Sequence, residues 1–145
     1  MNRSDDNPNL QTYLFFEGRC EEALEFYKRA IGAEVTRLFR FKDSPEPPDP
    51  NLMGPGFENK ILHAVFRVGP TTVMASDGRC TGQGAFQGFS LSLVTKSDAE
   101  MDRLFNALAE GGQVQMPAAK TFFSSRFGMV KDRFGVSWMV LVTPE

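Results

Sequence analysis

An internal repeat constrains the fold of this chain more than any other feature of its sequence. The stretch LQTYLFFEG at 10–18 alternates like a strand and ends in a turn, and GFSLSLVTK at 88–96 has the same pattern. Each stretch precedes a segment with helical spacing and then a similar tag, GAEV at Gly32 and GGQV at Gly111. Because neither half of such a repeat buries its apolar face alone, we expect two halves that pack against each other.

The first half of the repeat is predicted to fold as β-α-β-β-β. Its five elements are expected at residues 10–16, 20–31, 33–41, 60–68 and 71–76. One face of the expected helix is apolar and consists of Ala23, Leu24, Phe26, Tyr27, Ala30 and Ile31. Gly32 predicts a left-handed helix end. The proline-rich segment 42–57 is expected to be a flexible loop, either a lid over a site or a disordered excursion.

The second half repeats this order of elements. They are expected at residues 89–95, 97–110, 114–116, 126–131 and 136–142. Ser97, with Glu100 three residues later, is typical of a capping box at a helix start. Pro117 is expected to end the short strand before it. The last hairpin is predicted to turn at DRFG, with three turn and surface residues, Lys131, Asp132 and Arg133.

These elements predict a single α+β domain over residues 1–145. It consists of two modules at about 9–77 and 88–143, joined by a glycine-rich linker at 78–87. The linker has no phosphate-loop signature, because no Gly-Lys-Ser/Thr follows its glycines.

Composition and cysteine spacing exclude several classes of protein. The formal net charge of −2 provides no basic field for nucleic acid and no polybasic patch for a membrane surface. No apolar run approaches the roughly 20 residues that a membrane span needs, and the polar start MNRSDDNPN is not a secretory signal. Cys20 and Cys80 match no zinc or redox motif, so two free thiols in a cytoplasmic protein are favoured over a disulfide.

Three stretches carry a resemblance to a known family: YLFFEGRCEEALEFYKRAIGAEV, ILHAVFRVGPTTVMASDG and MVKDRFGVSWMVLV. They resemble the vicinal oxygen chelate superfamily, which includes glyoxalase I, bleomycin-resistance proteins and extradiol dioxygenases. Within that superfamily the chain is most similar to the PhnB-like branch. The resemblance covers nearly the whole chain. It implies a cupped mixed or antiparallel sheet in each of the two βαβββ modules, a site inside the cup, and a homodimer.

The resemblance also implies where a divalent metal would bind. Metal-dependent members carry one ligand on the first strand and one on the last strand of each module. The positions aligned with these ligands are Gln11, Met74, Phe89 and Met139. Only Gln11 offers an oxygen ligand, because thioethers bind such ions weakly and a phenyl ring does not bind them. No metal and no cofactor are therefore expected.

The same alignment predicts an apolar pocket in the cups. Six side chains are candidates to line it beside Gln11: Tyr13, Phe15, Met74, Phe89, Met139 and Arg126. Strand alternation places Tyr13 on the face of Gln11, and Phe89 on the face of Leu91. Two interpretations fit this set equally, an apolar small-molecule site with one or two polar anchors and a filled sheet interior. If Met139 faces the cup, Trp138 faces a helix or a partner subunit.

His63 is the only histidine and the candidate catalytic residue. Its intrinsic pKa near 6.5 suits a general acid or base, although a half-buried structural residue fits the same position. Strand alternation places His63, Val65 and Arg67 on one face. Asp77 is expected to cap the turn into the linker.

Three functions are compared on this basis. The favoured one is a small-molecule-binding protein, or a metal-independent enzyme, whose ligand is unidentified. A divalent-metal-dependent lyase or dioxygenase is the alternative, which the missing ligands disfavour. A methyltransferase, a label that such proteins have often carried, is not supported, because the chain lacks a glycine-rich nucleotide loop and a parallel βαβ order.

Overall fold

The computed structural model describes residues 8–143 and contains two modules of the same order. The first module consists of β1 (Thr12–Phe15), α1 (Cys20–Ile31), β2 (Glu34–Arg40), β3 (Ile61–Val68) and β4 (Thr71–Ser76). The second consists of β5 (Leu91–Thr95), α2 (Asp98–Ala109), β6 (Gln113–Ala119), β7 (Phe127–Lys131) and β8 (Ser137–Val142). The predicted α+β fold of two βαβββ modules is confirmed.

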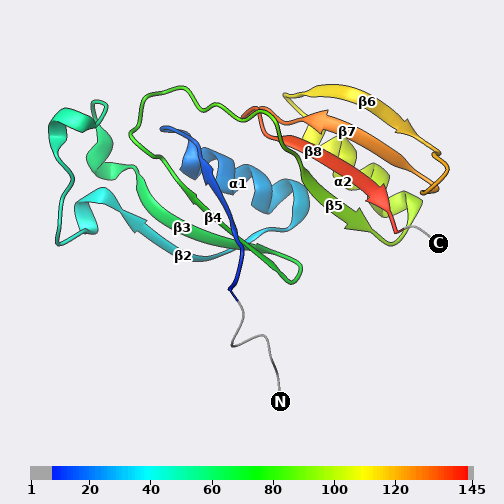
Figure 1. Ribbon diagram of the computed structural model, residues 1–145, viewed down its shortest axis with the longest axis horizontal. Coiled ribbons are helices and arrows are strands. Elements are labelled where there is room, and N and C mark those ends of the chain that lie inside the picture. Colours follow the sequence, from blue (N-terminus) through cyan, green and yellow to red (C-terminus); the bar gives the residue numbers. More distant parts are fainter. Residues whose placement is uncertain (1–7, 144–145) are drawn as a thin grey trace, which may run out of the picture.

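Each module forms one four-stranded mixed sheet. The strand orders are β1-β4-β3-β2 and β5-β8-β7-β6, so the two sheets have matching topologies. In both sheets the first strand runs parallel to the last strand, and the remaining neighbours are antiparallel. The modules lie side by side with a helix against each sheet, and the green linker crosses between them (Figure 1).

One apolar core connects the two modules. The six residues predicted to form the apolar face of α1 are all buried, and Gly32 ends this helix with a φ of 71°. Tyr27 of α1 packs against Phe134 and Trp138 of the second module, with ring centroids 6.2 and 5.6 Å away. Trp138 was expected to face either a helix or a partner subunit. Its contact with Tyr27 shows that it faces helix α1.

A buried carboxylate lies at this junction, and it corrects one prediction. Asp132 was expected at the surface of a turn, but only 2% of it is exposed. Its carboxylate accepts hydrogen bonds from Tyr27 Oη at 2.6 Å and Trp138 Nε1 at 2.9 Å, and also from the backbone N–H groups of Phe134 and Val136. The turn therefore points its acidic residue inward, where four donors compensate for the burial of its charge.

Pro117 gives a second correction. It does not end its strand, because β6 continues through it to Ala119. β6 is an edge strand, and its register shifts between Met116 and Ala119. A proline is tolerated at such a position, since no ladder hydrogen bond from its nitrogen is needed there.

The proline-rich segment contains short turns and no strand. Three 3-10 turns lie at Phe41–Asp43, Pro50–Leu52 and Phe57–Asn59. Asp49 begins the second of these turns by accepting a hydrogen bond from the Asn51 backbone.

No helix within residues 8–143 combines the length and apolar character of a membrane span.

Candidate functional site

Strand alternation in the first module separates a helix-packed face from an open face. On β3, Ala64 and Phe66 are buried in the core, whereas His63 and Val65 are half-buried on the opposite face. Val65 pairs with Met74 of β4, which in turn pairs with Tyr13 of β1. The sheet therefore presents Tyr13, Met74 and His63 together on its open face. His63 and Val65 share this face, as alternation within their strand predicted.

Tyr13 and His63 form a hydrogen-bonded pair on this open face. The Tyr13 hydroxyl lies 3.0 Å from Nδ1 of His63, and both residues are half-buried. Phe39 lies opposite His63 on β2 and is 47% exposed. His63 does not point toward the helix, so this geometry keeps its catalytic role as a prediction.

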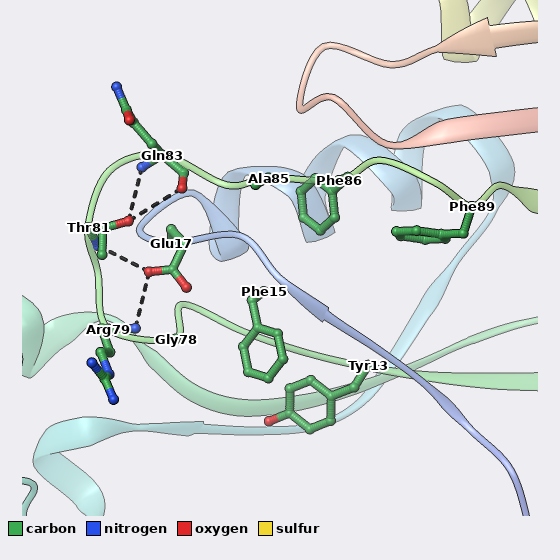
Figure 2. Close-up of a pocket in the computed structure, with 10 residues that line it drawn as sticks. All are labelled: Tyr13, Phe15, Glu17, Gly78, Arg79, Thr81, Gln83, Ala85, Phe86 and Phe89. Carbon is green, nitrogen blue, oxygen red and sulfur yellow. Dashed lines mark hydrogen bonds between the residues drawn. The ribbon is translucent and has the colours of Figure 1, made fainter.

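Four aromatic rings surround a pocket of about 520 Å³ between β1 and the linker. We call this space the aromatic pocket, and its rings belong to Tyr13, Phe15, Phe86 and Phe89. Tyr13 and Phe15 alternate on β1, and their rings stack with centroids 4.8 Å apart. Phe86 and Phe89 belong to the segment that connects the modules, so the pocket has one wall on the sheet and another on this segment (Figure 2).

Glu17 holds the linker against β1. Its Oε1 accepts hydrogen bonds from the backbone N–H groups of Arg79 and Thr81, each at 3.2 Å. A Cβ on Gly78 would lie 2.1 Å from Glu17 Oε2, so only a glycine leaves room for this carboxylate. In Figure 2 the carboxylate of Glu17 and the ring of Phe89 lie toward opposite ends of the pocket. Sequence reasoning missed Glu17, although it is the next alternate residue after Tyr13 and Phe15.

The strand pairing in the two sheets corrects one position in the sequence alignment of the two modules. Met74 pairs with Tyr13 and Met139 pairs with Ser92. Gln11 lies two residues before Tyr13, and Ser90 lies two residues before Ser92. Gln11 therefore corresponds to Ser90, one residue away from the Phe89 of the sequence alignment. Phe89 was also expected to share a face with Leu91. Leu91 packs against the core, whereas Phe89 precedes β5 and is 44% exposed, so their environments differ.

Five of the predicted site residues do not line the aromatic pocket: Gln11, His63, Met74, Met139 and Arg126. Gln11 is exposed and directly precedes β1. Arg126 forms an ion pair with Asp102 of α2, in which Nε lies 2.5 Å from Oδ1. The structure thus places Arg126 on the helix side of the second sheet. Met139 is half-buried on the other side, and it shares a second pocket with Phe89.

The donor set does not fit a divalent metal. The register gives Gln11, Met74, Ser90 and Met139 as the four corresponding positions, and two of these side chains are thioethers. No group of three His, Cys, Asp or Glu side chains that could hold a metal ion is found within residues 8–143. We therefore derive no chemistry that passes through a metal at this site.

Asp77 has a structural role broader than the predicted turn cap. It is 1% exposed, and its Oδ1 accepts hydrogen bonds from the N–H groups of Gly18 and Cys20 at 2.8 and 2.7 Å. Its Oδ2 accepts from the N–H of Ile61 at 2.7 Å. These bonds join the start of α1 to β3 and use both carboxylate oxygens.

Neither cysteine resembles an activated nucleophile. Both thiols are free and buried. Burial, with the Asp77 carboxylate as the next cause, raises the pKa of Cys80 to about 11 and that of Cys20 still further above its ordinary value. Reactive cysteines instead have lowered pKa values and partial exposure.

Comparison with known proteins places this geometry in a family. A family described as 3-demethylubiquinone-9 3-methyltransferase matches residues 8–141. Protein YjdN of Escherichia coli is 33% identical over 141 residues, which cover 94% of this chain and 96% of YjdN. The solved structure of protein PA1353 from Pseudomonas aeruginosa is 43% identical, covers 96% of this chain and 100% of its own, and has a TM-score of 0.81.

Two further solved structures are similar to this chain, one from the PhnB-like branch and one that shares only its fold. The PhnB protein from Bacillus cereus is 29% identical, with a TM-score of 0.77 over 94% of this chain and 100% of its own. A glyoxylase/bleomycin resistance protein/dioxygenase domain from Frankia sp. EAN1pec shares the fold at 15% identity and a TM-score of 0.62, over 96% of this chain and 93% of its own. The chain belongs to the PhnB-like family described as 3-demethylubiquinone-9 3-methyltransferase, and it has the fold of the glyoxylase/bleomycin resistance protein/dioxygenase domain.

Proposed function

We propose that this protein binds a small aromatic molecule in the aromatic pocket and that it does so without a metal ion. The observation that carries this proposal is the set of four rings around one pocket of about 520 Å³. Phe15 is 50% exposed and Phe89 is 44% exposed, so two of these rings present open surface to a ligand. A flat ring inserted between the two walls would cover this surface and stack on it.

The polar groups around the pocket suit a ligand that carries a polar substituent. The Tyr13 hydroxyl forms a hydrogen bond with His63, and the Glu17 carboxylate lies at the end of the pocket away from Phe89. If the protein is an enzyme, Tyr13 is the group that touches the substrate and His63 is its proton partner. Replacement of His63 by Gln would then slow turnover while the aromatic pocket continued to bind.

Methyl transfer is a second candidate, since the family description contains it. The same description includes a quinone derivative, and a flat ring of that type suits the aromatic pocket. A methyl donor such as S-adenosylmethionine needs a site of its own, and the two mixed sheets contain no parallel βαβ unit with a glycine-rich loop among the described residues. Calorimetric titration with S-adenosylmethionine tests this candidate, and micromolar binding would support it.

We further propose a cytoplasmic homodimer. Several apolar side chains on the sheets are open to solvent, including Phe39 at 47%, Val94 at 56% and Met116 at 46% exposure. Coverage of such surface by a second copy would stabilise it. Sedimentation at micromolar concentration tests the assembly, and a monomer alone would contradict it. The two free, buried cysteines support a reducing compartment.

The binding proposal is tested with phenylnaphthylamine, an uncharged aromatic probe that fluoresces when it leaves water. We expect saturable binding to the wild-type protein and a roughly tenfold weaker affinity for Phe89→Ala, the equivalent of about 1.4 kcal/mol of lost stacking. Phe122→Ala is the matched control, because this ring is 99% exposed and does not line the aromatic pocket. Equal weakening in both variants, or none in either, would argue against the proposal.

A further inference from the structure

A second pocket adjoins the aromatic pocket and differs from it in chemistry. It has a volume of about 530 Å³, and we call it the polar pocket. Phe86 and Phe89 line both pockets, so these rings form a shared boundary. The side chains of the second module that line the polar pocket are Ser90, Gln115, Lys131, Ser137 and Met139.

The sheet register explains why these residues meet. Lys131 at the end of β7 pairs with Ser137 at the start of β8, and Met139 follows on the same face. The neighbouring residues Val130 and Trp138 are buried on the opposite face, in the shared core. The register of β6 shifts between Val114 and Met116. This bulge adds Gln115 as an extra residue, and a bulge of this kind redirects a side chain.

The polar pocket offers hydrogen-bond donors and one positive charge. Lys131 is the one ionisable residue among the described residues that line it, and it is half-buried. None of the ion pairs within residues 8–143 includes Lys131. The hydroxyls of Ser90 and Ser137 lie 2.7 Å apart, and the amide of Gln115 adds two further donors.

We propose that the polar pocket binds the oxyanion of the ligand, a carboxylate or sulfonate, through Lys131 and the neighbouring hydroxyls. This inference rests on the proposed function, because the aromatic body of the same ligand would lie in the aromatic pocket. The ligand class is then an aromatic acid whose ring and charge lie on either side of Phe86 and Phe89. Its charged end points away from Glu17, whose carboxylate lies at the opposite end of the aromatic pocket and would repel it.

A matched pair of probes separates the two pockets. Anilinonaphthalene sulfonate has the ring system of phenylnaphthylamine plus one sulfonate. We expect the wild-type protein to bind the sulfonate about tenfold more tightly than the uncharged probe, since a charge-assisted contact is stronger than a neutral one. Added salt should reduce this advantage, because part of the polar pocket is open to solvent.

Lys131→Gln is the decisive variant. It keeps a polar side chain of similar length but removes the charge, so it should abolish the tenfold advantage of the sulfonate and leave the uncharged probe unchanged. Lys120→Gln is the control, because Lys120 is exposed beyond the other end of β6 and does not line the polar pocket. Circular dichroism of each variant confirms that probe binding reports on folded protein.

The outcomes distinguish this inference from the proposed function. If neither probe binds the wild-type protein, the proposed aromatic site is wrong, and this inference fails with it. If both probes bind with equal affinity and Lys131→Gln changes neither, the aromatic site stands and the anion pocket is overturned. Equal loss of the sulfonate advantage in Lys120→Gln would also overturn it, because the preference would then reflect general surface charge.

Discussion

The two helices begin in different ways, although their modules share one order of elements. α2 begins with its own cap, since Ser97 Oγ accepts a hydrogen bond from the Glu100 backbone at 3.1 Å. α1 has no side-chain cap from Arg19, the residue before it. Its start is held instead by Asp77, from the end of the fourth strand. A repeated fold can therefore replace a local cap with a distant carboxylate.

This difference changes what stabilises each helix. The cap of α2 exists as soon as four consecutive residues adopt their conformation. The hydrogen bond between Asp77 and Cys20 requires the first module to be folded, because 57 residues separate the two in sequence. Asp132 extends this pattern, since it joins Tyr27 of the first module to Trp138 of the second. Distant carboxylates should therefore contribute more to stability than the local cap.

The largest effect is expected at Asp132. Replacement by Ala leaves four donors without their acceptor at the junction of the modules, and we expect a loss of about 4 kcal/mol in the free energy of unfolding. Urea denaturation measures this loss. Asp98→Ala provides an exposed control, which should cost less than about 1 kcal/mol. A loss at Asp132 no larger than the control would show that the junction does not depend on this carboxylate.

Asp77→Ala tests the distant cap directly. Three backbone N–H groups lose their carboxylate acceptor, and two of these hydrogen bonds are fully buried, so we expect about 3 kcal/mol of destabilisation. Hydrogen exchange should show the loss at the first turn of α1 and at Ile61. Protection that falls equally in α2 would contradict a role confined to the first module.

Alkaline pH should weaken the protein through groups of the first module and the linker. Burial raises the pKa of Cys80 from 9.0 to about 11, so the unfolded state loses this proton first. Stability should fall from about pH 9 and lose about 2–3 kcal/mol by pH 11 through this thiol. The raised pKa values of Cys20 and Tyr27 act in the same direction. Urea titrations at several pH values should show a smaller slope for Cys80→Ala, and an unchanged slope would contradict this assignment.

Ser97→Ala should give the smallest effect of the series. Loss of a single N-cap hydrogen bond costs about 1 kcal/mol. Thermal unfolding compared with Asp77→Ala sharpens the contrast between the two helix starts. A larger loss at Ser97 than at Asp77 would reverse our interpretation that distant carboxylates dominate.

Local sequence patterns predicted most of the fold, but they did not predict which residues far apart in the sequence pack together. The helix of the second module was predicted from Ser97 and Glu100, because the capping pattern lies within four residues. Asp132 was misassigned to the surface, since a turn sequence does not reveal what the turn packs against. Pro117 was misread because the edge position of β6 depends on the strand order of the whole sheet.

The candidate site shows the same division. Strand alternation predicted a shared face for His63 and Val65 within one strand, but only the pairing of β1, β4 and β3 shows that Tyr13 lies on that face too. Phe86 and Lys131 were not identified as lining residues, because the path of an irregular segment and the strand register around it have no sequence period. The register of β5 with β8 moved the match of Gln11 from Phe89 to Ser90.

The segment that joins the modules also forms the boundary between the two pockets. Strand pairing fixes each sheet independently of this segment, whereas Phe86 and Phe89 depend on its length and path. Insertions and deletions are best tolerated in such connections. Under the proposed binding site, a change in the length of this one connecting segment would alter ligand preference while the paired strands, and with them the fold, stay the same.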